Sequence, residues 1–405
     1  MRKLHSENPN LKANINISGS KSETNRLLIL KAFFPDLEIK NPSDSDDTKV
    51  LIKALASKEK TIDIDHAGTA MRFLTAYFAF QNTEKILTGS QRMQNRPIEI
   101  LVEALQKLGA KIQYQNKEGF PPLHLQKGKI IADKIKIKAN ISSQYISALI
   151  LIGATFPKGL TIELEGEILS KPYIEMTLSL LSTIGISNEF TGNKIQIFPA
   201  EKLTQKEVVV ESDWSSASYF YSLAALSKSA ELKLSAFKEN SFQGDRKVVD
   251  FYKNLGVETY FQENSILLKK KKNFIFPEKF TADLTNFPDL AQTIAVTCLG
   301  LKIPFELNGL STLRIKETDR LQALQTELSK FGATIEIKNN SLIGKDFSLK
   351  ENIEISTYQD HRMAMAFAPL ALKTDLFIKN PEVVSKSFPT FWEVLKKCAI
   401  QQTII

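Results

Sequence analysis

The chain is poor in cysteine and has no long hydrophobic run. Its 405 residues include only two cysteines, Cys298 and Cys398, too few for a disulfide framework or a cysteine-rich zinc site. The most apolar stretch, residues 145–156, ends at Pro157 and is shorter than the roughly 18 residues that a membrane-spanning helix needs. The first residues lack the apolar segment of a signal peptide. These absences predict a cytoplasmic protein without a membrane partner.

The composition is that of a folded protein with a substantial core. Hydrophobic residues make up 43% of the chain and charged residues 24%, with 17 glycines and 15 prolines, which excludes disordered and collagen-like chains. The length predicts two or three domains. The formal net charge of +8 permits anionic partners but does not distinguish nucleic acid, membrane surfaces and phosphorylated metabolites.

A repeat marked by glycine runs through the sequence. In four places an amphipathic segment is followed by a glycine and then by a short β-branched run, and these glycines lie 76, 71 and 76 residues apart: Gly109, Gly185, Gly256 and Gly332. Glycine takes the left-handed conformation that ends many helices, so each marks a helix that hands over to a strand. Two weaker copies, at residues 47–55 and 389–399, bring the number of units to six.

A second set of six helices, apolar on all sides, is expected between the amphipathic ones. They span residues 22–34, 68–80, 142–156, 215–226, 289–300 and 360–372. A helix that is apolar all round is buried, and the alternating segments between the helices predict strands. We therefore expect an α/β protein of six units, three in each of two domains.

The first turns of these helices carry hydroxyl, amide and cationic side chains. Examples are Lys21 with Arg26, Arg72 after Gly68, and Arg362. Free backbone N–H groups and the helix dipole make helix starts anion sites, and such side chains add donors. A single polar helix start is most often an ordinary N-cap, but here the donors recur with the repeat. The pattern predicts a site for multiply anionic ligands.

Other site classes are excluded by spacing. A phosphate-binding P-loop needs glycine immediately before the lysine and again five residues earlier, but Ser20 and Ile15 occupy those positions. No Gly-x-Ser-x-Gly motif is evident, and the four histidines lack the spacing of metal ligands. We expect neither a metal ion nor a cofactor.

Several motifs together resemble those of the 5-enolpyruvylshikimate-3-phosphate (EPSP) synthase family. They occur in the family's order from about residue 18 to 391 and comprise Ser20-Lys21-Ser22 with Arg26, residues 67–72, Arg92-Met93 with Arg96-Pro97, Ser142-Ser143-Gln144, residues 170–173, residues 316–320, residues 360–365 and Lys386-Ser387-Phe388-Pro389. The resemblance implies two domains, each of three βαβαββ units around buried parallel helices, joined by a two-stranded hinge. The domains would be residues 13–211 and residues 1–12 plus 212–405, with the active site in the cleft between them.

The resemblance also implies the reaction. The family transfers the enolpyruvyl group of phosphoenolpyruvate to the 5-hydroxyl of shikimate 3-phosphate through a tetrahedral intermediate and releases phosphate. Carried over to this sequence, the ligands of shikimate 3-phosphate would be Lys21, Ser22, Arg26, Ser142, Ser143, Gln144, Ser170, Asp289 and Lys316. Those of phosphoenolpyruvate would be Lys21, Gly68, Arg96, Gln144, Arg320, Arg362 and Lys386.

Three residues are candidates for the proton transfers. The chemistry needs a base for the hydroxyl proton, an acid for the methylene carbon and cations for the departing phosphate. The resemblance places Asp289 as the base and Glu317 at the carbon, with Lys21 assisting either step. The division of roles among these three stays open, because protonation of the carbon is reversed during elimination.

The sequence departs from the family's usual residues at three positions in or near these motifs. His66 stands where Asn is usual, Phe73 where Pro is usual, and Thr312 where Asn is common. Thr312 puts one hydrogen bond to shikimate 3-phosphate in question. The family's inhibitor glyphosate competes with phosphoenolpyruvate near Gly68, so we expect inhibition, with a potency altered by His66 and Phe73.

Three alternative functions fit the sequence less well. UDP-N-acetylglucosamine enolpyruvyl transferases share the fold, but they carry a cysteine before their Arg-Pro and Asn after the lysine, whereas residues 92–96 contain no cysteine and Ser22 follows Lys21. A basic RNA-binding protein would need aromatic platforms beside its cations, and none accompany these helix starts. An inactive scaffold is disfavoured because Asp289, Glu317 and Lys21 are present. A monomer without nucleic-acid partners is expected.

Overall fold

The computed structural model describes residues 1–405, which divide into two compact units. Unit 1 consists of Met1–Ser18 and Glu211–Ile405, and unit 2 of Gly19–Val210. The chain therefore runs from unit 1 into unit 2 and returns once. This connectivity is that of a two-stranded link, as the family resemblance implied.

The boundaries differ from those expected from the sequence. Residues 13–18 and Glu211 belong to unit 1, because β2 (Asn10–Ile15) pairs in parallel with β13 (Ser229–Ser235) along its whole length. The carboxylate of Glu211 in turn accepts hydrogen bonds from Trp214 Nε1 at 2.7 Å and from the Lys238 amide at 2.8 Å. Strand pairing across more than 200 residues of sequence decided these limits, and local sequence pattern does not contain that information.

Unit 1 contains three four-stranded sheets with the orders β14-β15-β13-β2, β16-β17-β19-β18 and β20-β21-β1-β22. In each, a parallel pair is extended by two antiparallel strands. The remaining strands are β1 (Arg2–His5), β14 (Val257–Gln262), β15 (Ser265–Lys270), β16 (Phe280–Asp283), β17 (Phe305–Asn308), β18 (Thr334–Lys338), β19 (Ser341–Lys345), β20 (Ile353–Ile355), β21 (Leu376–Ile378) and β22 (Gln401–Ile404). In the third sheet, strands from the two ends of the chain take the place of a hairpin.

Unit 2 repeats this sheet twice, with the orders β4-β5-β7-β6 and β10-β11-β9-β8, and its third sheet is only the parallel pair β12-β3. The predicted α/β fold of six repeats is confirmed, with the sheet of one repeat reduced to two strands. The strands are β3 (Glu38–Lys40), β4 (Thr61–Asp63), β5 (Lys85–Thr88), β6 (Lys111–Tyr114), β7 (Leu123–Gln126), β8 (Lys134–Lys138), β9 (Leu160–Glu165), β10 (Asn188–Thr191), β11 (Lys194–Ile197) and β12 (Glu207–Val209).

Six helices fill the interior of the two units, as their apolar composition predicted. They are α1 (Lys21–Phe33), α3 (Gly68–Phe80) and α5 (Ser143–Gly153) in unit 2, and α7 (Trp214–Leu226), α9 (Ala291–Leu301) and α11 (His361–Phe367) in unit 1. The last is extended by the 3₁₀-helix η5 (Ala368–Leu372). Each unit has its own hydrophobic core around these helices. No helix is long and apolar enough to cross a membrane.

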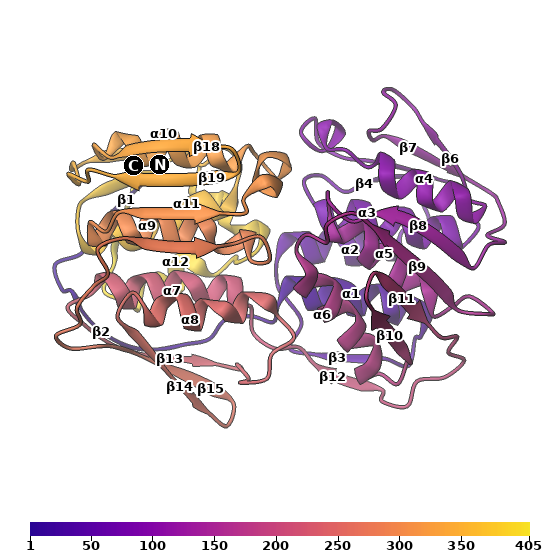
Figure 1. The fold of residues 1–405 in the computed structure, drawn as a ribbon, viewed down its shortest axis with the longest axis horizontal. Helices are drawn as coiled ribbons and strands as arrows, with labels where there is room; N and C mark the ends of the chain where they lie inside the picture. The colour runs from indigo at the N-terminus through magenta and orange to yellow at the C-terminus, as the bar shows by residue number, and fades with distance from the viewer. The chain divides into compact units, whose positions relative to one another are not determined.

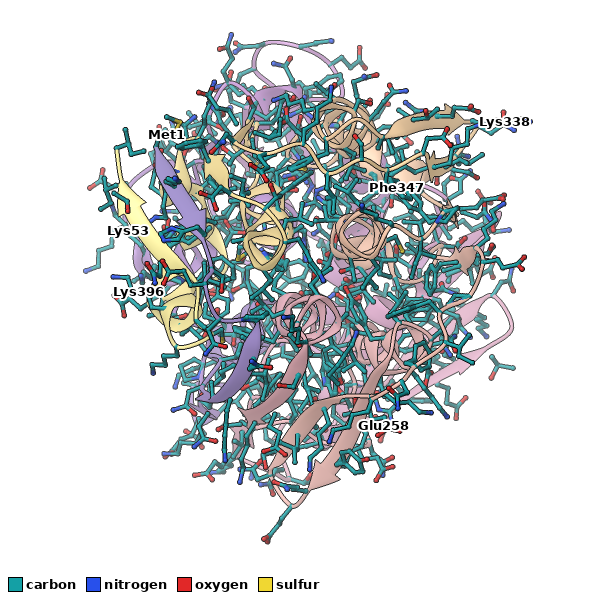
Figure 2. The ribbon with its side chains drawn as sticks, turned by 90° about the vertical axis from the view of Figure 1, so that its left-hand side faces the viewer. Met1, Lys53, Glu258, Lys338, Phe347 and Lys396 are labelled. Carbon is teal, nitrogen blue, oxygen red and sulfur yellow. The ribbon has the colours of Figure 1, made fainter.

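The amphipathic helices lie nearer the surface. They are α2 (Asp46–Ala56), α4 (Glu99–Leu108), α6 (Lys171–Thr183), α8 (Val248–Lys253), α10 (Arg320–Lys330) and α12 (Phe391–Lys396). Within unit 1, the sheet containing β2 and β13 lies beside α7 and α8 (Figure 1), and α10 lies beside β18. Figure 2 views helices of unit 1 nearly end-on, with Glu258 of β14 and Lys338 of β18 at the periphery. Sheets therefore cover a helical interior.

The four repeat glycines end helices as predicted. Gly109, Gly185, Gly256 and Gly332 have φ angles of 114°, 88°, 79° and 81°, in the left-handed region that favours glycine. The chain turns at each of them into a strand. The repeat seen in the sequence is thus a repeat of helix ends.

Candidate active site

The candidate residues of unit 1 lie where buried or amphipathic helices begin. Asp289 is in the 3₁₀-helix η3 (Pro288–Leu290) that leads into α9. Lys316 and Glu317 follow η4 (Ser311–Ile315), and Arg320 opens α10. Arg362 is in the first turn of α11, and Lys386 ends η6 (Pro381–Lys386). Repetition of one unit therefore brings equivalent helix starts into one region of unit 1.

Asp289 is surrounded by three cations. Arg362 Nη2 lies 2.8 Å from Oδ2, Arg320 Nη1 lies 3.0 Å from Oδ1, and Lys316 Nζ lies 3.8 Å from Oδ1. Burial by itself raises the pKa of Asp289, but the charges of Arg362, Lys316 and Arg320 outweigh it and hold that pKa well below its usual range. Asp289 is therefore ionised at neutral pH, in direct contact with the groups expected to bind the substrates.

Arg320 links three carboxylates at the centre of this cluster. Its Nε donates to Asp360 Oδ2 at 2.6 Å, its Nη2 to Glu317 Oε2 at 2.9 Å, and its Nη1 to Asp289. Burial lowers the pKa of Arg320, but Asp360, Glu317 and Asp289 raise it further. Lys386 Nζ lies 3.4 Å from the other oxygen of Glu317. The six candidates of unit 1 thus form one connected network.

The turn before Arg362 is held in an unusual backbone conformation. Tyr358 and Gln359 have φ angles of 54° and 56°, a region that non-glycine residues rarely adopt. The fully buried Glu327 of α10 secures this turn, because its carboxylate accepts from Tyr358 Oη at 2.6 Å and from the Ser356 amide at 3.2 Å. The turn then delivers Asp360, which caps α11 by accepting from the Arg362 amide at 2.9 Å.

Asp245 is a further carboxylate in this region, which the sequence did not single out. It is 4% exposed and accepts a short hydrogen bond from Ser215 Oγ. Burial, followed by repulsion from Asp289, raises the pKa of Asp245 to about 7, although Arg362 opposes the shift. The only sequence signal was its position after Gln243-Gly244, where a carboxylate reads as an ordinary turn residue.

The candidates of unit 2 lie on α1, α3, α5 and the turns before α4 and α6. Lys21, the first residue of α1, pairs with Asp47 of α2, with Nζ 3.1 Å from Oδ2. Both side chains are mostly buried, and in the sequence Asp47 stands out only as the start of a weak repeat copy. Ser142 caps α5 by accepting from the Gln144 amide, and Gln144 Nε2 donates to Thr69 Oγ1 at 3.3 Å. The starts of α3 and α5 are therefore joined directly.

Arg26 is buried and ties α1 to two neighbouring helices. Nε donates to Thr177 Oγ1 at 2.7 Å, and Nη2 donates to Ser147 Oγ and to the Tyr173 carbonyl. With the bond from Nη1 to the Ser22 carbonyl, four of its five N–H groups are used within the protein. Its guanidinium also lies 5.4 Å from the ring centroid of Phe73. Burial lowers the pKa of Arg26 to about 10, with Tyr173 and Glu23 opposing, so it stays charged at neutral pH.

Gly68 and Arg96 are packed against each other. A Cβ atom at residue 68 would lie 2.5 Å from Arg96 Nη1 and 3.0 Å from its Cζ, closer than a side chain permits. The buried Arg72 holds both sides of this contact, since it donates to the Gly68 carbonyl at 3.3 Å and to the Pro97 carbonyl at 2.9 Å. A larger residue at position 68 would therefore force the Arg96 guanidinium to move.

Two further candidates of unit 2 are buried. Ser143, in the first turn of α5, is 7% exposed, and Ser170, which precedes α6, is 6% exposed with a φ angle of 53°. The candidate residues thus form two sets, one in each unit. In unit 1, Thr312, which stands where the family commonly has Asn, is buried, and its hydroxyl has no hydrogen-bond partner within the protein.

The carboxylates of the sites are occupied with cations. No group of three or more His, Cys, Asp or Glu side chains is arranged to hold a metal ion. The basic residues approach the carboxylates from several helix starts, which suits the reversible binding of anions.

Comparison with known proteins decides the family. A family model described as EPSP synthase (3-phosphoshikimate 1-carboxyvinyltransferase) matches residues 51–395. A 3-phosphoshikimate 1-carboxyvinyltransferase of Bacteroides fragilis is 46% identical over 403 residues, with 98% of each chain covered. The chain belongs to the EPSP synthase family.

More distant relatives and solved structures also cover nearly the whole chain. A 3-phosphoshikimate 1-carboxyvinyltransferase of Buchnera aphidicola is 35% identical over 426 residues, which span 95% of this chain and 94% of its own. Among solved structures, an EPSP synthase from Acinetobacter baumannii aligns with a TM-score of 0.76 at 21% identity and covers both chains completely. The enolpyruvyl transferase NikO from Streptomyces tendae aligns with a TM-score of 0.72 at 15% identity over 99% of each chain. The last two likenesses establish the enolpyruvyl transferase fold.

Proposed function

We propose that this member of the EPSP synthase family catalyses transfer of the enolpyruvyl group from phosphoenolpyruvate to the 5-hydroxyl of shikimate 3-phosphate, with release of phosphate. The observation that carries the proposal is the network around Asp289, in which an ionised carboxylate is surrounded by Arg362, Arg320 and Lys316. Such a network provides cations for two phosphorylated substrates and a carboxylate for proton transfer in one place.

The two sets of side chains would divide the substrates as the family resemblance implies. Shikimate 3-phosphate would be bound by Ser22, Arg26, Ser142, Ser143, Gln144, Ser170, Asp289 and Lys316, and phosphoenolpyruvate by Gly68, Arg96, Gln144, Arg320, Arg362 and Lys386, with Lys21 contacting both. Arg26 has one remaining N–H, on Nη1, to offer a ligand. The unpartnered hydroxyl of Thr312 can supply a hydrogen bond where the family commonly has Asn.

The reaction proceeds in two steps. In the first, the 5-hydroxyl oxygen bonds to C2 of phosphoenolpyruvate, its proton passes to a base, and C3 gains a proton and becomes a methyl group. In the second, C3 loses a proton and the bond from C2 to the phosphate oxygen breaks, which restores the double bond. We propose Asp289 as the base, Glu317 at C3, and Lys21 as an aid to either transfer.

The contacts of Asp289 suggest how substrate binding prepares the base. A carboxylate whose pKa is held low by three cations is a weak base. When anionic substrates take up Arg362 and Lys316, those cations neutralise the substrates and stabilise the Asp289 charge less. The pKa of Asp289 then rises towards the range in which it accepts a proton efficiently. The base would thus be strengthened only when the substrates are present.

A direct assay tests the proposed function. Purified protein is mixed with phosphoenolpyruvate and shikimate 3-phosphate, and phosphate release is followed. A parallel assay replaces shikimate 3-phosphate with UDP-N-acetylglucosamine. Turnover with shikimate 3-phosphate alone supports the proposal, turnover with the UDP-sugar alone identifies the sister reaction, and no release with either acceptor refutes both.

We propose further that both sets of side chains act on the same substrates, and that substrate binding makes the protein more compact. Unit 1 and unit 2 each hold cations at helix starts, and an anionic ligand bound by both sets would favour the compact state. Small-angle scattering with and without shikimate 3-phosphate tests this proposal. A smaller radius of gyration with ligand is expected, and an unchanged radius would contradict it.

Three narrower proposals complete this assignment. Glyphosate should compete with phosphoenolpyruvate, because Gly68 allows the Arg96 guanidinium a position from which a larger residue would displace it. The protein should act as a monomer without a cofactor, which light scattering and activity after dialysis against a chelator can test. A cytoplasmic location is in keeping with its two reduced, buried cysteines.

A further inference from the structure

His66 makes two specific contacts at the turn that precedes α3. Its Nδ1 lies 2.7 Å from Ser90 Oγ, and its Nε2 lies 3.3 Å from Asp65 Oδ1. In the tautomer protonated at Nε2, Nδ1 accepts a hydrogen bond from Ser90 Oγ–H and Nε2 lies beside the Asp65 carboxylate.

Ser90 begins the turn that carries Arg96. Its hydroxyl accepts from the Met93 amide at 3.3 Å, and its carbonyl accepts from the Gln94 amide at 3.0 Å. The Arg96 amide then donates to the Met93 carbonyl at 3.0 Å. Ser90 is thus the first member of a continuous chain of hydrogen bonds that sets the course of the backbone up to Arg96.

The same turn is fixed to the start of α3 from both ends. At its beginning, the Ser90 amide donates to the Asp65 carbonyl at 3.1 Å, and the hydroxyl of Ser90 meets His66. At its end, Arg72 donates to the Pro97 and Gly68 carbonyls. Between these two sets of contacts, the Arg96 guanidinium lies against Gly68. A displacement of Ser90 would therefore move the backbone that carries Arg96.

We propose that His66 is a positioning residue for Arg96, which it holds in place for phosphoenolpyruvate through its hydrogen bond with Ser90. The inference rests on the proposed function, since it takes Arg96 to be a ligand of that substrate. His66 itself does not touch the reacting atoms. Its effect is to restrict the Ser90–Arg96 turn, so that the guanidinium needs no rearrangement when the anion binds.

The geometry of histidine and asparagine gives a matched pair of variants. Both Nδ1 of histidine and Oδ1 of asparagine are bonded to Cγ, so His66→Asn keeps an acceptor for the Ser90 hydroxyl. His66→Phe keeps the ring volume and removes the acceptor. Asp65→Asn is the control, because it weakens only the contact at Nε2 and leaves the Ser90 bond in place.

Steady-state kinetics with each substrate varied in turn tests the proposal. His66→Phe should raise KM for phosphoenolpyruvate about three- to tenfold, the value of one hydrogen bond, with kcat and KM for shikimate 3-phosphate within about twofold of wild type. His66→Asn and Asp65→Asn should stay within about twofold on all three parameters. An unchanged KM for phosphoenolpyruvate in His66→Phe, or equal damage in His66→Asn, would overturn it.

Hydrogen exchange separates this inference from the proposed function. The Met93 and Arg96 amides bond to Ser90 Oγ and the Met93 carbonyl, so they should exchange faster in His66→Phe than in wild type and at the wild-type rate in His66→Asn. This comparison needs no substrate. If wild-type protein releases no phosphate, the proposed function fails, while equal exchange in all variants would refute the positioning role by itself.

Discussion

Replacing Asp245 by asparagine should stabilise the protein at neutral pH and have much less effect in acid. The Asp245 side chain is buried and accepts from Ser215 Oγ. Burial and the nearby charge of Asp289 raise its pKa to about 7. Asparagine has the shape of the protonated acid and carries no charge, so Asp245→Asn removes an ionisation that the folded state disfavours.

The sign and size of the effect follow from proton linkage. An aspartate in the unfolded chain has a pKa of about 3.9, so between about pH 4 and pH 7 the folded protein binds more protons than the unfolded chain. The stability that Asp245 contributes is fully present below about pH 4 and is lost as the pH rises to about 7. A shift of three pKa units corresponds to roughly 4 kcal/mol. About 2–3 kcal/mol of this falls between pH 5 and pH 8.

Urea unfolding at pH 5 and pH 8 measures this difference. The buried Trp214 and Trp392 both belong to unit 1, as Asp245 does, so their fluorescence reports the relevant unfolding. The stability gain of Asp245→Asn over wild type should grow by about 2–3 kcal/mol from pH 5 to pH 8. Asp250→Asn, at an exposed carboxylate of α8, is the control and should show no such trend. A gain in Asp245→Asn that is independent of pH would refute the reasoning.

Three further predictions concern the candidate site. Asp289→Asn should lower kcat at least 100-fold without raising either KM, since it leaves the surroundings more positive; near-normal turnover would exclude Asp289 as the base. Lys21→Ala should raise KM and lower kcat, and it should lower the melting temperature because Asp47 loses its cation. Steady-state kinetics and thermal unfolding measure these effects, and no change in either would show that Lys21 is an ordinary surface residue. Gly68→Ala should displace the Arg96 guanidinium by about 1 Å and raise KM for phosphoenolpyruvate about tenfold or more. In an Arg96→Ala background the same change should add little, and full additivity would disprove the steric link.

Much of the fold could be read from local pattern, because its repeated feature is a helix end. Gly109 and Gly332 mark left-handed turns that few other residues adopt, and the apolar helices between the repeats have no polar face to expose. The strand composition of two sheets could not be predicted in this way. In unit 2, one sheet consists only of β3 and β12. In unit 1, one sheet contains β1 and β22, which come from opposite ends of the chain.

The residue types of the candidate site were also available from the sequence, but their partners were not. Lys21 and Arg320 stand at helix starts by virtue of local sequence, whereas Asp47 and Asp245 look like ordinary turn or cap residues. Their proximity to Lys21 and Asp289 depends on how separate helices pack. The departure at His66 was visible as a substitution, while its bond to Ser90 required the folded turn.

The sequence by itself therefore determined the family, the six-unit α/β plan and the residues that can bind anions, because these depend on spacing and on side-chain chemistry. Tertiary structure alone decided the domain limits at Ser18 and Val210, the low pKa of Asp289 and the raised pKa of Asp245. The physical reason is that strand pairing and electrostatic interaction act between residues that are distant in the chain. Their strength depends on distance and burial, which only the folded protein defines.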